Sequence, residues 1–389
     1  MRPINGARDE PARSSHEASK PAAILDTVPR SGVLRAGSSR APFIGRPLVQ
    51  RLISWFKGNA RDLPWRRTRD PYAIWASEIM LQQTRVKAVL PYWGRWMKSL
   101  PDMRSLAGAS EQKIHKLWEG LGYYHRVRNM QKAARMILTE HDGEFPSDFE
   151  QVLALPGIGR YTAGAICSIA FNQPTPILDG NVIRVLTRLF GISGDPREKK
   201  TNAALWSLAQ ALVEAAAPNS CSQLNQSLME LGALICTPRN PRCGVCPVSS
   251  RCAALRQGRV DQLPETAPRL FATQRRFVAF VARKGDLLFV RQRPASVVNA
   301  RLWEFPNVEI FPNDGDLDQA SHAALGTRKV GLKKLCTIRH SITRYAISMD
   351  VFGVTVAKAN VTTDGEWLSP SSLRKLPFCS AHKRILQQL

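Results

Sequence analysis

Residues Leu155 to Val185 read LPGIGRYTAGAICSIAFNQPTPILDGNVIRV, a stretch that predicts two helices with chemistry at both junctions. Gly157 and Gly159 flank one apolar residue directly before a helical run. Glycine adopts positive φ at little cost, so the turn can aim free helix N–H groups outward, which suits a phosphate. Asp179 begins the next apolar-periodic segment, where it can cap the helix and the dipole favours its ionised form. The stretch therefore predicts a phosphate-binding turn one helix away from a charged carboxylate.

Each feature alone has a purely structural interpretation, because such a turn often only connects helices and a capping Asp often only caps. Together they resemble the helix-hairpin-helix of DNA glycosylases of the endonuclease III superfamily. In that superfamily the hairpin grips the DNA backbone and the downstream Asp is catalytic. The resemblance implies that Gly157 and Gly159 bind DNA and that Asp179 takes part in catalysis.

Length and charge narrow the class of protein. A chain of 389 residues is long enough for two domains. Its net charge of +24 favours a polyanionic partner. The sequence has no apolar run long enough to cross a membrane, and its first forty residues lack the apolar core of a secretory signal.

Changes in composition and periodicity along the chain indicate a multidomain fold. Residues 1–45 mix Pro, Ser, Ala and Arg without periodicity, which predicts a disordered basic leader. A transit peptide is an alternative, although its acidic residues argue against one. Helical periodicity runs through 46–255 and predicts an all-α half. Residues 256–270 are polar and contain prolines, as a linker would, and 271–389 mix strand and helix patterns typical of an α/β domain.

The cysteines indicate a metal site in a reducing compartment. Cys236, Cys243, Cys246 and Cys252 have the spacing C-x6-C-x2-C-x5-C. Four thiolates in a short loop suit either tetrahedral zinc or a [4Fe–4S] cluster, and spacing alone does not choose. The pattern resembles the cluster loop that ends the catalytic domain in the endonuclease III superfamily, which implies [4Fe–4S]. We expect the cluster to fold and place a DNA-facing loop at 236–252, without acting in bond cleavage.

Glu78 and Asp179 are candidates for a proton donor and for a permanently charged carboxylate. Glu78 lies in WASEIMLQQT among apolar and amide neighbours, so burial should raise its pKa. The pKa of Asp179 should instead be lowered at its helix start. A salt-bridged Glu78 is the alternative, but Arg85 and Lys87 lie too far along the helix for an i,i+4 pair. Breaking an N-glycosidic bond needs one protonated and one ionised carboxyl group, since the base leaves protonated and the sugar becomes cationic.

Further motifs resemble one family. SEIMLQQTRV, GLGYYHRVRN, LPGIGRYTAGAI, LDGNVIRVLTR and LNQSLMELGALIC, with the cysteine loop, are similar to adenine DNA glycosylases of the MutY type. The resemblance implies removal of adenine mispaired with 8-oxoguanine or guanine. Tyr161 stands where endonuclease III-like enzymes carry the lysine that attacks the sugar. A phenol cannot form that Schiff base, so a monofunctional glycosylase is expected.

The resemblance also implies roles for individual residues. Glu78 would protonate adenine and then assist water, Asp179 would stabilise the sugar cation with Tyr161 beside it, and Asn181 would support the water. Arg66, Trp65, Leu81 and Gln226 would form the adenine pocket, with Gln226 pairing with the edge of the flipped base. Gln83 and Tyr123 would wedge into the duplex. For Trp65, Leu81 and Tyr123 a core position is the open alternative.

The C-terminal half resembles a Nudix-like domain through RLWEFPNVE. It lacks the Glu-rich helix that holds magnesium in Nudix hydrolases, so a lesion-reading role is expected. Ile338, Arg339 and His340 stand where the family usually carries Phe-Ser-His in its lesion-reading loop. Arg339, His340 and the following Ser341 are therefore the lesion-recognition candidates.

We expect a monofunctional glycosylase that acts as a monomer on double-stranded DNA. A mismatch-specific thymine glycosylase and a non-catalytic DNA-binding iron–sulfur protein are the rivals. The first is disfavoured by the added domain, and the second by the presence of both Glu78 and Asp179. The expected compartment is the bacterial cytoplasm at the nucleoid, or the nucleus or mitochondrion in a eukaryote.

Overall fold

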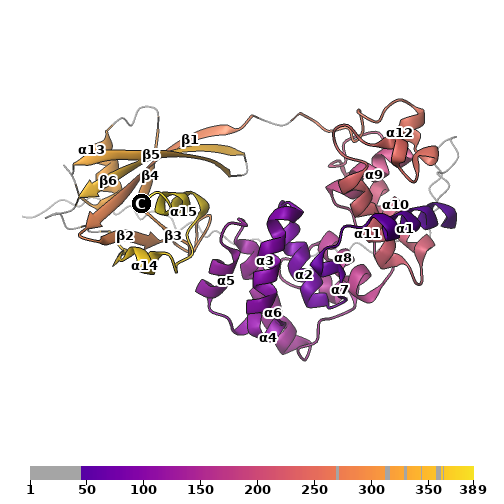
Figure 1. The fold of residues 1–389 in the computed structure, drawn as a ribbon, viewed down its shortest axis with the longest axis horizontal. Helices are drawn as coiled ribbons and strands as arrows, with labels where there is room; N and C mark the ends of the chain where they lie inside the picture. The colour runs from indigo at the N-terminus through magenta and orange to yellow at the C-terminus, as the bar shows by residue number, and fades with distance from the viewer. Residues whose placement is uncertain are drawn as a thin grey trace, which may run out of the picture. The chain divides into compact units, whose positions relative to one another are not determined.

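The structure is a computed structural model that describes residues 45–268, 271–311, 316–327, 331–342, 344–355, 361 and 363–389 (Figure 1). The chain divides into the units Met1–Phe43 and Ile44–Leu389. The expected leader, apart from Gly45, lies outside the described residues, as do the last two residues of the expected linker.

The described residues from 45 to 268 form helices and no strands. In order they are α1 (Arg46–Asn59), α2 (Pro71–Leu81), α3 (Val86–Ser99), α4 (Met103–Gly108), α5 (Glu111–Trp118), α6 (His125–Glu140), α7 (Phe149–Ala154), α8 (Arg160–Phe171), α9 (Gly180–Phe190), α10 (Lys199–Ala216), α11 (Cys221–Leu234) and α12 (Ala253–Arg256), with short 3₁₀ turns η1 (Pro64–Arg66), η2 (Cys243–Val245) and η3 (Ser249–Arg251).

Capping side chains explain where several helices begin. Asp70 accepts hydrogen bonds from the Tyr72 and Ala73 backbone N–H groups, and Pro71 follows it as the first helical residue of α2. Ser147 and Glu150 have the S-x-x-E spacing that predicts a capping box, but this prediction is wrong by one residue. Asp148 is the N-cap of α7, because its carboxylate accepts from the N–H groups of Glu150 and Gln151.

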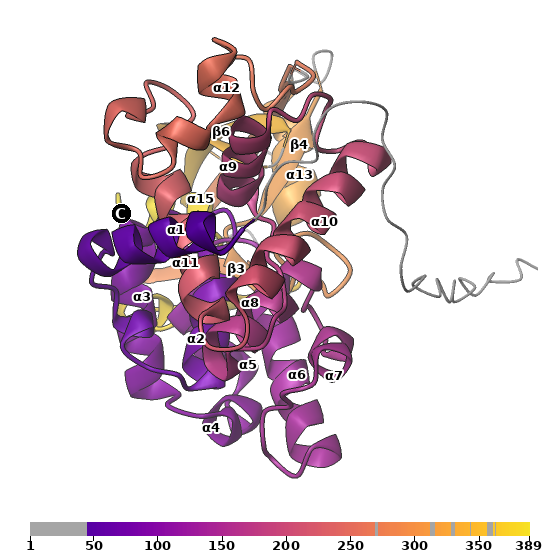
Figure 2. The ribbon, with the colours of Figure 1, turned by 90° about the vertical axis from the view of Figure 1, so that its right-hand side faces the viewer.

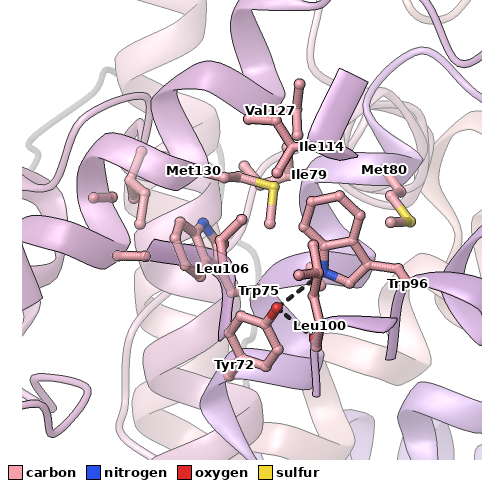
Figure 3. Packing of buried hydrophobic residues seen from close by; sticks show 14 of the residues in the cluster. Tyr72, Trp75, Ile79, Met80, Trp96, Leu100, Leu106, Ile114, Val127 and Met130 are labelled. Atoms are coloured by element: carbon pink, nitrogen blue, oxygen red, sulfur yellow. Dashed lines mark hydrogen bonds between the residues drawn. The ribbon is translucent and has the colours of Figure 1, made fainter. Parts of the chain in front are cut away.

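The helices pack around two hydrophobic cores. One core lies around α2 to α6 and includes Trp75, Trp96 and Trp118, all fully buried. Figure 3 shows part of it, where Tyr72 donates to the Leu100 carbonyl at 2.8 Å and accepts from Trp96 Nε1 at 3.0 Å. The second core joins α1 to α9, α10 and α11, which lie together in Figure 2. Helices α2 and α8 pack against each other and connect the two cores.

The described residues beyond 271 form a sheet with helices on both faces. Its strands are β1 (Thr273–Lys284), β2 (Leu287–Gln292), β3 (Trp303–Glu304), β4 (Asn307–Ile310), β5 (Leu332–Ile342), β6 (Tyr345–Thr355) and β7 (Glu366–Leu368), and its helices are α13 (Leu317–Leu325), α14 (Pro370–Leu373) and α15 (Ser380–Leu386). The main order is β3-β2-β1-β6-β5, with β1 and β6 parallel.

Burial explains the apolar run in β1. Val278 and Phe280 face a core with α13, whereas Ala279 and Val281 face a core with α15. Because both faces are covered, the strand reads as continuous apolar sequence.

The segment before the sheet is anchored to the helical half. Leu263 is buried, and its carbonyl accepts from Arg188 Nε at 2.9 Å. The carboxylate of Glu265 accepts from the Gly194 N–H at 2.7 Å. The two halves of Ile44–Leu389 also touch, since Glu119 of the helical half accepts from Lys383 Nζ at 2.7 Å and from the Phe378 N–H at 2.9 Å. Among the described residues, no helix combines the length and apolar character needed to cross a membrane.

Candidate active site

A cavity of about 610 Å³ opens between the two helical cores. Its walls come from η1, α2 and the turn after it, the first helical residues of α9, and facing residues of α8 and α11. The lining includes these predicted site residues: Trp65, Arg66, Glu78, Leu81, Gln83, Tyr161, Asp179, Asn181 and Gln226. The fold therefore brings together residues that are up to about 160 positions apart in the sequence.

Glu78 and Tyr161 form a direct pair in this cavity. Glu78 lies on α2 with 5% of its surface exposed, and Tyr161 Oη donates to its Oε2 at 2.8 Å. Burial raises the pKa of Glu78 to about 7, in the expected direction, although the hydrogen bond from Tyr161 works against this shift. Burial and the nearby carboxylates hold the pKa of the Tyr161 phenol well above its usual range. A carboxyl that can carry a proton near neutral pH therefore faces the cavity.

Asp179 is the N-cap of α9, as expected. Its Oδ1 accepts from the Val182 N–H at 2.8 Å, and its Oδ2 accepts from Asn181 Nδ2 at 3.0 Å. The expected lowering of its pKa is wrong, because burial raises the pKa of Asp179 and outweighs these two hydrogen bonds and the charge of Arg184. Arg184 in turn donates to Asn181 Oδ1 at 2.9 Å, which fixes the orientation of the amide.

A buried ion pair that the sequence did not reveal forms another wall. The Glu230 side chain on α11 is fully buried, and its carboxylate accepts from Arg66 at 2.7 Å and from Arg61 at 2.8 Å. Burial alone would raise its pKa, but the hydrogen bonds from Arg61 and Arg66 lower the pKa of Glu230 to about 2. Arg66 is thus held by a permanent anion beside the cavity. The sequence held one signal for Glu230. It follows Gln226 by one helical turn, so the two side chains can lie on the same wall of the cavity.

Trp65 and Leu81 both line the cavity and pack in the hydrophobic core. The two alternatives, a pocket wall and a core position, therefore do not exclude each other. Trp65 lines the cavity yet is only 6% exposed and packs edge-on against Trp93, with ring centroids 5.9 Å apart. Leu81 lines the cavity and packs at the rim of the first core. Gln226 lines the cavity and donates to Ser222 Oγ at 3.1 Å.

The helix-hairpin-helix turn differs in one detail from expectation. Gly157 has the expected positive φ of 80°, but Gly159 is the N-cap of α8 with a φ of −100°, so only one of the two uses glycine's freedom. A Cβ on Gly157 would come within 2.6 Å of Asn129 Cβ.

The two wedge candidates occupy turns with unusual backbone. Gln83 has a φ of 57° and Tyr123 a φ of 48°, and both side chains are exposed. Tyr123 does not line the cavity and lies in the turn between α5 and α6. Its exposure argues against the alternative of a core position.

The four clustered cysteines converge on a small cavity of about 30 Å³ beside α9. Arg188 is next to them and donates to Cys236 Sγ at 3.5 Å. Four soft sulfur ligands with a neighbouring cation fit an anionic thiolate cluster.

The lesion-recognition candidates lie away from the main cavity. Arg339, His340 and Ser341 line a hollow of about 320 Å³ on the sheet. The expectation that the segment from Ile338 to His340 forms a loop is wrong, since it lies inside β5 and pairs with β6. Ile338 is fully buried, Arg339 is exposed, and His340 Nδ1 has no hydrogen-bond partner among the described residues.

Comparisons with known proteins agree with this arrangement. Residues 76–211 match the family described as HhH-GPD superfamily base excision DNA repair protein. Residues 236–252 match the iron-sulfur binding domain of endonuclease III, and 277–388 match the NUDIX domain. The match at 236–252 supports an iron–sulfur cofactor over zinc.

Individual proteins are similar over most of the chain. The adenine DNA glycosylase of Rattus norvegicus is 35% identical over 86% of this chain and 76% of its own length. That of Buchnera aphidicola (Schizaphis graminum) is 36% identical over 67% of this chain and 74% of its own. The structure of a thermostable thymine-DNA glycosylase is 30% identical, with a TM-score of 0.50, over 55% of this chain and 97% of its own. With its helix-hairpin-helix half, iron–sulfur loop and Nudix-like domain, this chain belongs to the adenine DNA glycosylases of base excision DNA repair.

Proposed function

We propose that this DNA glycosylase hydrolyses the N-glycosidic bond of adenine mispaired with 8-oxoguanine or guanine. The observation that carries the proposal is the 2.8 Å hydrogen bond from Tyr161 to Glu78 in a cavity shared with Asp179. This arrangement supplies a proton donor, an anion and a phenol, and Tyr161 offers no amine for a covalent intermediate.

The reaction uses the two carboxyl groups in turn. Protonated Glu78 gives its proton to a ring nitrogen of adenine, and the electrons of the breaking bond leave with the base. The sugar cation lies against ionised Asp179, whose charge the Val182 N–H and the Asn181 amide stabilise. Water then bonds to the sugar carbon and its proton passes to the Glu78 carboxylate, which restores the acid.

The pocket candidates can select the base. Gln226 presents an amide, which has both a donor and an acceptor for the edge of adenine, and Arg66 is oriented by Glu230. Gln83 and Tyr123 would fill the gap in the duplex, while Gly157 and Gly159 bring backbone N–H groups to a phosphate. Cys236, Cys243, Cys246 and Cys252 would hold a [4Fe–4S] cluster that stabilises the loop they belong to.

One assay with four duplexes tests the reaction and its rivals. The duplexes carry A opposite 8-oxoguanine, A opposite G, T opposite G, and C opposite 8-oxoguanine, each resolved with and without alkali. We expect release of adenine only, strand breakage only after alkali, and no adduct on adding borohydride. Release of thymine would support the thymine glycosylase rival, whose name the similar solved structure carries. No release of any base would support a non-catalytic DNA-binding protein.

Lesion reading is assigned to the hollow of Arg339, His340 and Ser341. A base contact by Arg339 would cost roughly 1–3 kcal/mol on the right lesion when lost, whereas a lost phosphate contact flattens the log–log salt slope by about 0.9. We expect Arg339→Ser to lose discrimination between 8-oxoguanine and guanine with little change in slope. Arg344→Ser, at the nearby hairpin turn, is the matched control. Equal weakening on both duplexes with a flatter slope would assign Arg339 to the backbone.

We further propose that the protein acts on DNA in its cell and binds one duplex as a monomer. The expected compartment is the cytoplasm at the nucleoid, or the nucleus or mitochondrion in a eukaryote. Sedimentation of the protein with and without duplex tests the stoichiometry.

A further inference from the structure

A buried arginine outside the cavity occupies the junction of two exposed turns. Arg126 is the second residue of α6, is 6% exposed, and does not line the cavity. Burying a guanidinium is unfavourable unless its N–H groups are satisfied, and burial lowers the pKa of Arg126 to about 10. The contacts of Arg126 should therefore explain why its guanidinium is buried.

The two ends of the guanidinium bond to two different segments. Nη1 donates to the Ile79 carbonyl at 2.6 Å and to the Gln82 carbonyl at 2.8 Å, at the C-terminal end of α2. Nη2 donates to the Leu121 and Gly122 carbonyls, both at 3.1 Å, in the turn between α5 and α6. One rigid group thus connects the helix that carries Glu78 to a turn more than forty residues away in sequence.

Both connected turns hold a residue in a strained conformation. Gln83 follows the first set of carbonyls and has a φ of 57°, and Tyr123 follows the second and has a φ of 48°. For residues other than glycine this left-handed region is unfavourable and persists where surrounding contacts enforce it. The guanidinium also lies 5.7 Å from the centre of the Tyr123 ring. Arg126 is placed to enforce both conformations.

We propose that Arg126 is a positioning residue that fixes Gln83 and Tyr123 relative to each other and to α2, so that both enter the duplex together. The inference rests on the proposed function, in which these two side chains fill the gap left by the flipped base. A planar guanidinium can bond two segments at once, whereas a lysine ammonium has fewer donors and a single centre.

A double-mutant cycle tests the proposal. Arg126→Lys is made in the wild-type chain and in the Gln83→Ala/Tyr123→Ala chain, and single-turnover adenine excision is measured on A opposite 8-oxoguanine. The duplex carries 2-aminopurine beside the target adenine to report unstacking. Arg135→Lys, on the same helix and bonded to a single carbonyl, is the matched control. Hydrogen exchange is followed over 79–84 and 119–124.

We expect Arg126→Lys to lower excision and the 2-aminopurine signal roughly tenfold in the wild-type chain, as loss of one or two charged hydrogen bonds implies. In the Gln83→Ala/Tyr123→Ala chain the further loss should be under about twofold, because the residues that Arg126 positions are gone. Both segments should exchange faster together, and Arg135→Lys should change none of these readouts.

Equal losses in both chains would overturn the inference, as would normal unstacking with slow excision. Global loss of exchange protection in Arg126→Lys would also overturn it, because Arg126 would then be needed for the fold as a whole. A wild-type chain that releases no adenine would instead refute the proposed function, so the two failures are distinguishable.

Discussion

Glu78 must be protonated to act as the proposed acid, and its burial favours the protonated form. Burial raises the pKa of its carboxyl from an ordinary 4.5 to about 7. Between these values the folded protein holds a proton that the unfolded chain has released, so the free energy of unfolding falls as pH rises from about 4.5 to 7. Activity should fall as pH rises above about 7, because the donor is then ionised.

Glu78→Gln should therefore separate stability from activity. We expect the variant to be more stable than the wild type at pH 8 by on the order of 1–3 kcal/mol, with a smaller difference at pH 5.5. Adenine excision should fall by roughly 10²–10⁴-fold. Urea unfolding at the two pH values and single-turnover assays measure these effects, with exposed Glu111→Gln as control. A stability difference that is the same at both pH values would contradict a raised pKa.

Glu230 has the opposite titration behaviour. Its two arginine partners lower its pKa to about 2, so its stabilising charge is fully present above about 4.5 and is lost as pH falls toward 2. Glu230→Gln would leave Arg61 and Arg66 without their anion, and we expect the free energy of unfolding at pH 7 to fall by roughly 3–5 kcal/mol. Denaturant titration measures it, with Glu214→Gln on α10 as the exposed control. A change below about 1 kcal/mol would mean that solvent replaces the lost carboxylate.

Single residues with an unusual local context were predictable, and their partners were not. Glu78 and Asp179 each stand out within their own segment, Tyr161 was identified through the family resemblance, and the fold brings all three to one cavity. Arg61 and Glu230 lie 169 positions apart, so their ion pair depends on how α1 and α11 pack. The pKa of Asp179 was misjudged for the same reason, since burial comes from the tertiary fold while capping can be read locally.

At the scale of elements, the hairpin turn offers a pair of glycines with different requirements. Gly157→Ala would place a Cβ at positive φ and within 2.6 Å of Asn129 Cβ, whereas a Cβ on Gly159 would meet nothing within 4 Å. We expect Gly157→Ala to destabilise the fold by roughly 1–3 kcal/mol and to weaken DNA binding. Gly159→Ala, the matched control, should change stability by less than about 0.5 kcal/mol. Thermal unfolding and duplex titration of the two proteins measure this, and equal effects would refute the assigned turn geometry.

Elements with a clear apolar period were predicted well, and exposed ones were not. The stripe of Leu48, Leu52, Ile53 and Phe56 is buried on α1 as its spacing indicates. Strand β5 was missed because, among its residues, only Ile338 is buried, so the edge strand shows no alternation. The sequence pattern therefore did not contradict the loop that the family resemblance implied for the lesion-recognition candidates.

At the scale of the whole molecule, the sites that we propose for adenine and for its partner base lie in different halves of the chain. The cavity lies in the helical half, and the hollow of Arg339, His340 and Ser341 lies on the sheet. Glu119 connects the halves, because it is 6% exposed and accepts from Lys383 and from the Phe378 N–H across the contact. A buried carboxylate with these partners cannot be removed without leaving a cation and a backbone N–H unsatisfied.

Glu119→Ala should therefore affect selectivity more than chemistry. We expect the preference for adenine opposite 8-oxoguanine over adenine opposite guanine to fall about tenfold, equivalent to roughly 1.4 kcal/mol of lost coupling between the halves. Excision of adenine opposite guanine, which we expect to depend on the cavity alone, should stay within about threefold of the wild-type rate, a change of well under 1.4 kcal/mol. Glu111→Ala, an exposed residue at the start of α5, the helix that ends just before Glu119, is the control. Equal losses on both duplexes would show that Glu119 stabilises the helical half itself, and unchanged selectivity would show that the contact carries no lesion signal.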